Sequence, residues 1–165
     1  MALSRIESDT HVAGNLSANT MTYPAGSIAN VDVSSGASIA TTKLQHRHSK
    51  TYAQESATNA ADESRVLFTA YGATGSVISF KAGAVVAATG NATCSVDLKK
   101  NGTTILSSAL SLTSSQTAYA ELTATIGTSS FVAGDNLEVA IDGTIGTGAL
   151  AKGIYCTLVV DETAS

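Results

Sequence analysis

The sequence has no tryptophan, one proline and two cysteines among 165 residues, and only 13% of its residues are charged. So little charge excludes a long charged coiled coil, and a hydrophobic content of 44% excludes a chain disordered through low hydrophobicity and high charge. A net charge of -4 gives no general basic surface for nucleic acid or a membrane. No apolar run is long enough to span a bilayer, and residues 1–15 lack the hydrophobic stretch of a secretory signal.

The two cysteines, Cys94 and Cys156, lie far apart in the sequence. They form neither a zinc-binding nor a redox spacing. We interpret them as buried thiols rather than as a disulfide.

The composition of the chain changes near residue 65. Residues 1–64 are polar with isolated apolar residues, too few for a core of their own, and the only proline, Pro24, marks a turn. We interpret this part as an extended N-terminal arm and linker that is ordered against another surface. Within it, residues 41–65 are compatible with a short helix or with an extended linker.

From Arg65 onward the sequence has the alternation of short β-strands. Cys94, Val96 and Leu98 fall on one face of a strand at residues 93–100, and Asn101-Gly102 follows as a strong hairpin signal, because a type I′ turn needs positive φ at both central residues. Further strands are expected at 66–71, 76–89, 104–112, 117–126 and 153–162. Residues 131–141 are expected to hold a turn at Gly134-Asp135, followed by a strand with Leu137, Val139 and Ile141 facing inward. Seven or eight strands predict a mainly-β domain at 65–165, an antiparallel β-sandwich of jelly-roll or immunoglobulin-like type.

Motifs for catalysis are weak in this sequence. The glycine-rich loop at residues 143–153 lacks the Gly-Lys-Ser/Thr of a phosphate-binding loop, and no serine stands in a Gly-x-Ser-x-Gly elbow. The acidic pairs Asp62/Glu63 and Asp161/Glu162 are neighbours, so a strand would direct the two carboxylates of each pair to opposite faces. We therefore expect the protein not to be an enzyme and to use no metal or cofactor.

Basic and imidazole groups gather in one short stretch that contains Lys43, His46, Arg47, His48 and Lys50. An extended chain would place both imidazoles on the same side. They could bind a metal with a third ligand from elsewhere in the chain, where His11 is the only other histidine. In a homotrimer, one histidine from each chain would supply three ligands around the axis. The stretch could also contact nucleic acid. We favour a third interpretation, in which it is a polar junction at a subunit interface.

The order of these parts resembles that of known virion proteins. A sparse arm at residues 11–54 precedes a small sandwich that contains "VDLKKNGTTIL" and "FVAGDNLEVAI". This arrangement resembles capsid decoration (cement) and head-fibre proteins of tailed bacteriophages, and "SIANVDVSSGASIATTKL" is similar to segments of trimeric fibre and cement proteins, in which three chains share one core. The resemblance carries over no catalytic residues.

The resemblance implies a trimeric decoration protein that is made in the host cytoplasm and sits on the outer surface of the virion. Its partners would be the major capsid protein and two further copies of itself, with no nucleic acid and no membrane, and it would stabilise the shell through its arm. The residues expected at the capsid or trimer interface are Leu16, Met21, Ile28, Val31, Val33, Ile39, Lys43, Leu44, His46, Arg47, His48 and Lys50.

The alternative function is a tail or head fibre that recognises host-surface carbohydrate. Aromatic side chains normally line sugar sites, and several of those in the sandwich must fill the core instead. The aromatic residues available are Phe68, Tyr71, Phe80, Tyr119, Phe131 and Tyr155.

Overall fold

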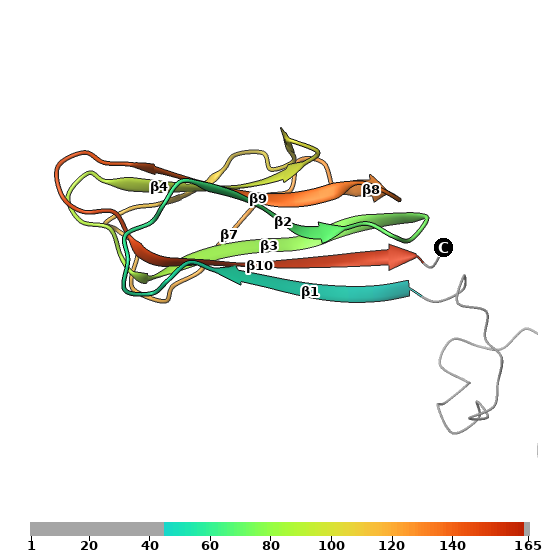
Figure 1. Ribbon diagram of the computed structural model, residues 1–165, viewed down its shortest axis with the longest axis horizontal. Helices are drawn as coiled ribbons and strands as arrows, with labels where there is room; N and C mark the ends of the chain where they lie inside the picture. The colour runs from blue at the N-terminus through green and yellow to red at the C-terminus, as the bar shows by residue number, and fades with distance from the viewer. Residues whose placement is uncertain (1–44, 164–165) are drawn as a thin grey trace, which may run out of the picture. The chain divides into compact units, whose positions relative to one another are not determined.

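The computed structural model describes residues 45–163, for Gln45 the backbone only. These residues form ten β-strands that pack as two layers, and they contain no helix (Figure 1). Within the same residues there is accordingly no helix that could cross a membrane. The strands are β1 (Gln45–Ala53), β2 (Glu63–Thr69), β3 (Thr74–Val86), β4 (Thr93–Lys100), β5 (Thr103–Thr104), β6 (Leu110–Leu112), β7 (Leu122–Thr123), β8 (Ser130–Val132), β9 (Asn136–Thr144) and β10 (Lys152–Thr163).

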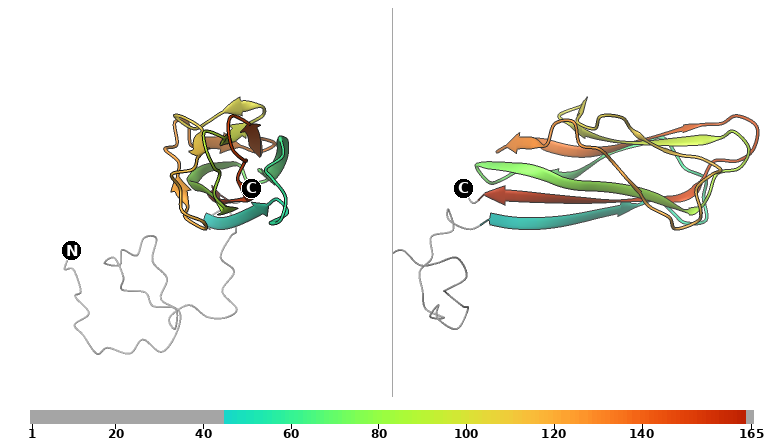
Figure 2. Two further views of the ribbon diagram at one scale, coloured as in Figure 1. Left: turned by 90° about the vertical axis from the view of Figure 1, so that its left-hand side faces the viewer. Right: turned by 180° about the vertical axis from the view of Figure 1, so that it is seen from behind.

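Each layer is an antiparallel sheet built from strands that are distant in the sequence. Sheet A has the order β1-β10-β3, with β7 and β8 both paired to β3. Sheet B has the order β2-β9-β4, with β5 and β6 both paired to β4. The two sheets lie face to face, as the views in Figures 1 and 2 show. The expectation of a mainly-β antiparallel sandwich is therefore confirmed.

The pairing of the strands is nested. The first strand pairs with the last, β2 pairs with β9, β3 pairs with β7 and β8, and β4 pairs with β5 and β6. If β5/β6 and β7/β8 are each counted as one interrupted strand, the chain is a single long antiparallel hairpin that has been wound up into two sheets. This nesting is the jelly-roll arrangement. Of the two expected types of sandwich, the structure therefore has the jelly roll and not the immunoglobulin-like type.

The core lies between the sheets and follows the alternation in the sequence. Cys94, Val96 and Leu98 on β4 are all buried, as expected from their spacing. Sheet A contributes buried side chains from β3 and β10, such as Phe80 and Leu158. Each fully buried side chain of this size stabilises the fold by about 1.5–3 kcal/mol.

The Asn101-Gly102 turn has the predicted geometry. Asn101 has φ 49° and Gly102 has φ 81°, and the turn joins β4 to β5 in an antiparallel pair. Positive φ at both positions is what a type I′ turn requires.

The strand expected at residues 117–126 is mostly absent. Only Leu122–Thr123 pair, as β7, with β3. Tyr119 has φ 64°, outside the strand region of backbone conformation, and its amide donates to the Ala84 carbonyl at 2.8 Å. The loop before β7 is thus held by single hydrogen bonds instead of by a ladder.

The boundary expected at residue 65 is wrong, because the sandwich begins earlier. The residues 45–53 form β1, which pairs with β10 over its full length, and residue 65 lies inside β2. Of the two conformations considered for residues 41–65, the described part takes neither a helix nor a free linker but an edge strand and a loop. The polar sequence of β1 reflects its position at the edge of sheet A, where one edge of the strand and its outward-facing side chains are in contact with water.

Both cysteines are buried and free, as the sequence suggested. Cys94 lies on β4 of sheet B and Cys156 lies on β10 of sheet A. Burial raises the pKa of the Cys94 thiol, and it raises the pKa of Cys156 to about 11. Neither thiol is therefore in the reactive thiolate form near neutral pH.

Candidate functional site

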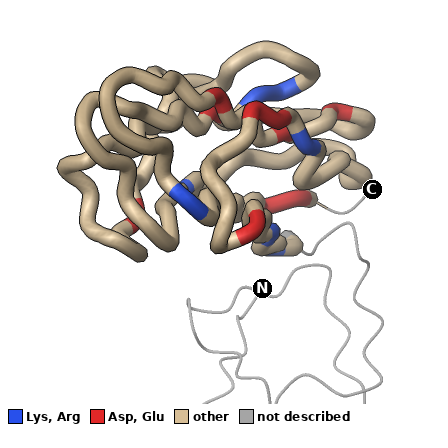
Figure 3. The backbone as a smooth tube through the Cα atoms, turned by 60° about the vertical axis from the view of Figure 1, so that its left-hand side comes forward, with Lys and Arg blue, Asp and Glu red and all other residues tan. Residues whose placement is uncertain are grey.

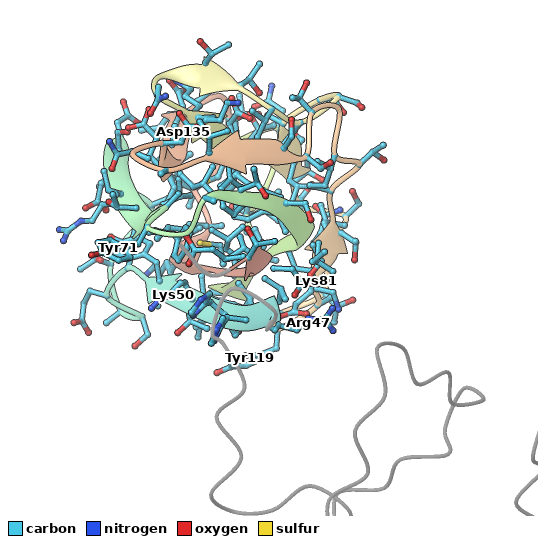
Figure 4. The ribbon with its side chains drawn as sticks, turned by 90° about the vertical axis from the view of Figure 1, so that its right-hand side faces the viewer. Arg47, Lys50, Tyr71, Lys81, Tyr119 and Asp135 are labelled. Carbon is cyan, nitrogen blue, oxygen red and sulfur yellow. The ribbon has the colours of Figure 1, made fainter. Side chains whose placement is uncertain are left out.

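The candidate site is the seam between β1 and β2, the outermost strands of the two sheets in the described residues. Side chains of the two strands meet along this seam, since His48 of β1 lies against Phe68 of β2 and Tyr52 of β1 contacts Glu63 of β2. Of the basic stretch, His46, Arg47, His48 and Lys50 fall on β1 and lie close together. In the end-on view, Arg47 and Lys50 lie toward different sides of β1 (Figure 4).

On the outer side of sheet A, Arg47 forms a two-point ion pair with Asp161 of β10. The guanidinium Nε and Nη2 donate to the two carboxylate oxygens at 2.7 and 2.8 Å. The Asp161 side chain is only 7% exposed, because the Arg47 side chain, itself 66% exposed, lies beside it. The hydrogen bonds from Arg47 lower the pKa of Asp161 and raise that of the guanidinium. This pair joins the first and last strands of the fold.

On the other side of β1, the two imidazoles lie together as the sequence predicted. The rings of His46 and His48 are stacked with centroids 6.4 Å apart. The His48 ring also lies 5.5 Å from the ring of Phe68, which meets Phe131 edge-on at 5.8 Å. The half-buried His48 therefore extends the aromatic core of the sandwich to its open side.

Glu162, the second residue of the acidic pair Asp161/Glu162, is a buried carboxylate. Its Oε1 accepts hydrogen bonds from the backbone amides of Tyr71, at 2.7 Å, and Gly72. Its other oxygen lies 3.4 Å from Nε2 of His48. Glu162 thus fixes the turn between β2 and β3, while its neighbour Asp161 binds Arg47. The expectation that this acidic pair is split between opposite faces is confirmed.

At the far end of the seam, where β1 ends, the surface has a cleft of about 410 Å³. Its wall includes side chains from the end of β1, the following loop and β2. Among the residues that line it are Tyr52, Gln54, Glu55, Asn59, Glu63 and Arg65.

Several polar groups of the cleft converge on Glu63. The Tyr52 hydroxyl and the Arg65 guanidinium both donate to the Glu63 carboxylate, and Gln54 donates to it at 3.2 Å. The Arg65 guanidinium also lies 5.4 Å from the centre of the Tyr52 ring. The hydrogen bond from Tyr52, with a smaller effect from that of Arg65, lowers the pKa of Glu63. Burial, with a smaller effect from the hydrogen bond to Glu63, raises the pKa of Tyr52.

Sequence reasoning did not find this cleft. Glu63 and Arg65 stand two residues apart, so a strand puts them on the same side, and this was the only signal available. Their contact with Tyr52 depends on the pairing of β1 and β2 with β10 and β9. The other acidic residue of the pair, Asp62, points elsewhere and accepts a hydrogen bond from the Gly143 amide at 2.7 Å.

Of the remaining predicted interface residues, the structure describes only Lys50. Lys50 is exposed and has no ion-pair partner among the residues that the structure describes. The following lie outside the described residues: Leu16, Met21, Ile28, Val31, Val33, Ile39, Lys43 and Leu44. Within residues 45–163, no three histidine, cysteine or acidic side chains are grouped so that they could hold a metal ion.

Comparison with known protein families and with curated proteins finds no match for this chain.

Proposed function

We propose that the protein is a structural component of a phage virion. It is a trimeric decoration protein on the outer surface of the capsid, held there by the segment that precedes β1, and it stabilises the shell against disassembly. The observation that most supports this proposal is the complete pairing of β1 with β10. Any force on the segment before Gln45 reaches the sandwich through this nine-residue strand, its ladder of hydrogen bonds and the Arg47–Asp161 pair.

A second observation supports a structural role. The charged side chains of the seam and of the adjoining outer side of sheet A are used to hold the fold together. Asp161 binds a guanidinium, Glu162 binds backbone amides, and Glu63 binds Tyr52 and Arg65. A jelly roll that uses its polar groups in this way is a rigid body that can be added to a lattice. Rigid modules lose little conformational entropy when they bind.

The alternative function, recognition of host carbohydrate, is supported by a different feature. Phe68, Phe80 and Phe131 are buried, whereas Tyr71 and Tyr119 are 83% and 68% exposed. The cleft beside Tyr52 also presents amide and carboxylate groups of the kind that bind sugar hydroxyls. A fibre protein would use one of these surfaces.

The two functions are separated by electron microscopy of purified virions with a gold-labelled antibody raised against the sandwich. A decoration protein predicts gold over the whole shell, and a receptor-binding fibre predicts gold at the tail or at isolated fibres. Virions of a deletion phage serve as the control for non-specific labelling. Labelling at the tail alone would overturn the proposal.

Attachment is tested with particles that lack the protein. We expect full-length protein to bind them and to delay their heat disruption. A variant without residues 1–39 keeps β1 intact, and we expect it to fold but not to bind. Equal binding by both proteins would move the attachment surface to the sandwich.

A further inference from the structure

The two outer faces of the sandwich differ in charge. On sheet A, the paired strands β1, β10 and β3 place outward-facing residues in rows across the sheet. One row is Ser49, Val159 and Ser79, and the next is Thr51, Thr157 and Lys81. Five of these six residues are uncharged, and their alternate neighbours Leu158 and Phe80 point into the core. We call these two rows the neutral face.

The charges in and beside the neutral face are already paired within the chain. At one end, Arg47 is bound to Asp161. On the side of β7, Lys81 lies 3.7 Å from a Glu121 carboxylate oxygen. Figure 4 labels Arg47 and Lys81 at this rim. The neutral face therefore has no net charge.

On the outer face of sheet B, three successive rows each contain a charged residue. One row is Val66, Glu138 and Lys99, and the next is Ser64, Ala140 and Asp97. In the row beyond, Ser95 is paired with Asp142. The few charged positions of the described chain appear as isolated segments of the tube in Figure 3.

This difference decides which face can lie near a symmetry axis. In a homo-oligomer, the residues nearest the axis meet the same residues of the other copies. A charged residue there meets its own charge and is removed from water at the same time, and both effects oppose assembly. The centres of subunit interfaces are correspondingly depleted of charged residues. Sheet A satisfies this condition and sheet B does not.

We propose that the neutral face is the surface through which copies of this chain pack about the axis of a homotrimer. The inference rests on the trimer of the proposed function and adds which surface builds it. Sheet A would face the axis, and sheet B, whose charged rows hold more acidic than basic residues, would face outward. The β-branched residues Thr51, Thr157 and Val159 would supply most of the contact.

The chain offers a matched pair of serines for the test. Ser79 lies on the neutral face in β3, and Ser95 lies on the outer face of sheet B in β4. Both are half-buried positions in strands that have a neighbour on each side. Ser79→Lys and Ser79→Glu are compared with Ser95→Lys and Ser95→Glu in the full-length chain.

The measurement is the molar mass from size-exclusion chromatography with light scattering at micromolar concentration. We expect three times 16.6 kDa for the unchanged protein and for both Ser95 variants. Both Ser79 variants should run as monomers, with trimer association weakened at least 100-fold, because either sign of charge meets its own copies at the axis. Added salt should partly restore the trimer of Ser79→Lys by screening this repulsion.

Circular dichroism establishes that each variant is folded. If Ser79 variants do not fold, Ser49→Lys replaces them, since Ser49 lies in the same row on an exposed edge strand.

Trimers formed by folded Ser79 and Ser49 variants would overturn the inference and leave the virion function standing. An unchanged protein that is monomeric would also overturn it. Loss of capsid binding by Ser79 variants that remain trimeric, with Ser95 variants unaffected, would assign the face to the capsid instead. Absence of the protein from the shell would refute the proposed function separately.

Discussion

Arg47 on the first strand and Asp161 on the last are joined by two hydrogen bonds of 2.7 and 2.8 Å. The two residues stand directly opposite each other in the β1–β10 ladder. Two-point pairing of a guanidinium with a carboxylate fixes geometry as well as adding attraction. The pair therefore marks β1 as an integral strand of the sandwich.

Removal of β1 should destroy the fold, while removal of the residues before it should not. A variant that starts at residue 40 keeps all ten strands of the described residues, and we expect a cooperative thermal transition by circular dichroism. A variant that starts at residue 65 loses β1 and part of β2, so that β10 becomes an edge strand beside an uncovered core. Because small domains are stable by only about 5–15 kcal/mol, we expect this shorter variant to be unfolded or aggregated. A cooperative transition in the shorter variant would show that β1 is dispensable.

The Arg47–Asp161 pair should make stability depend on pH in the acid range. The pKa of Asp161 is lowered in the folded state, so the pair stabilises the protein above the unfolded-state value of about 4, and this contribution is lost as the pH falls through the folded-state pKa. We expect the melting temperature to fall less steeply between pH 5 and pH 2 in Asp161→Asn than in the unchanged protein. Arg47→Gln removes the same pair and should flatten the profile in the same way. Additive effects in the double variant would argue against a direct pair.

Gly102→Val should destabilise the sandwich through backbone conformation alone. Gly102 has φ 81°, and a Cβ added there would meet no atom closer than 3.9 Å, so steric clash with neighbours is small. A β-branched residue at positive φ costs about 1–3 kcal/mol. Urea denaturation should show a loss of this size. Thr103→Val, at the next exposed position, is the control and should change stability by less than about 0.5 kcal/mol.

Neither thiol should react while the protein is folded. Burial raises the pKa of Cys156 to about 11 and also raises that of Cys94, so little thiolate is present at pH 8. We expect a thiol reagent such as DTNB to label both cysteines in guanidinium chloride and neither in native buffer over the same period. Fast labelling of Cys156 without denaturant would indicate that β1 detaches from β10 and uncovers the core.

The sequence alone determined the features that depend on near neighbours. The alternation of Cys94, Val96 and Leu98 identified a buried strand face, because side chains alternate with a period of two in any strand. Asn101-Gly102 identified the hairpin, because few other residues accept positive φ at both positions. The spacing of His46 and His48 placed both rings on one side for the same geometric reason.

Only the tertiary structure decided the features that depend on distant partners. The polar sequence of β1 resembles that of a linker, and its strand character comes from a ladder with β10, more than 100 residues away. The Tyr52–Glu63–Arg65 cleft and the neutral face likewise need the strand order of both sheets. A period of two indicates which side of a strand is buried but carries no information on which strand lies beside it. In a jelly roll, whose pairs are nested from the chain ends inward, the partner strands are therefore fixed by packing of the whole domain.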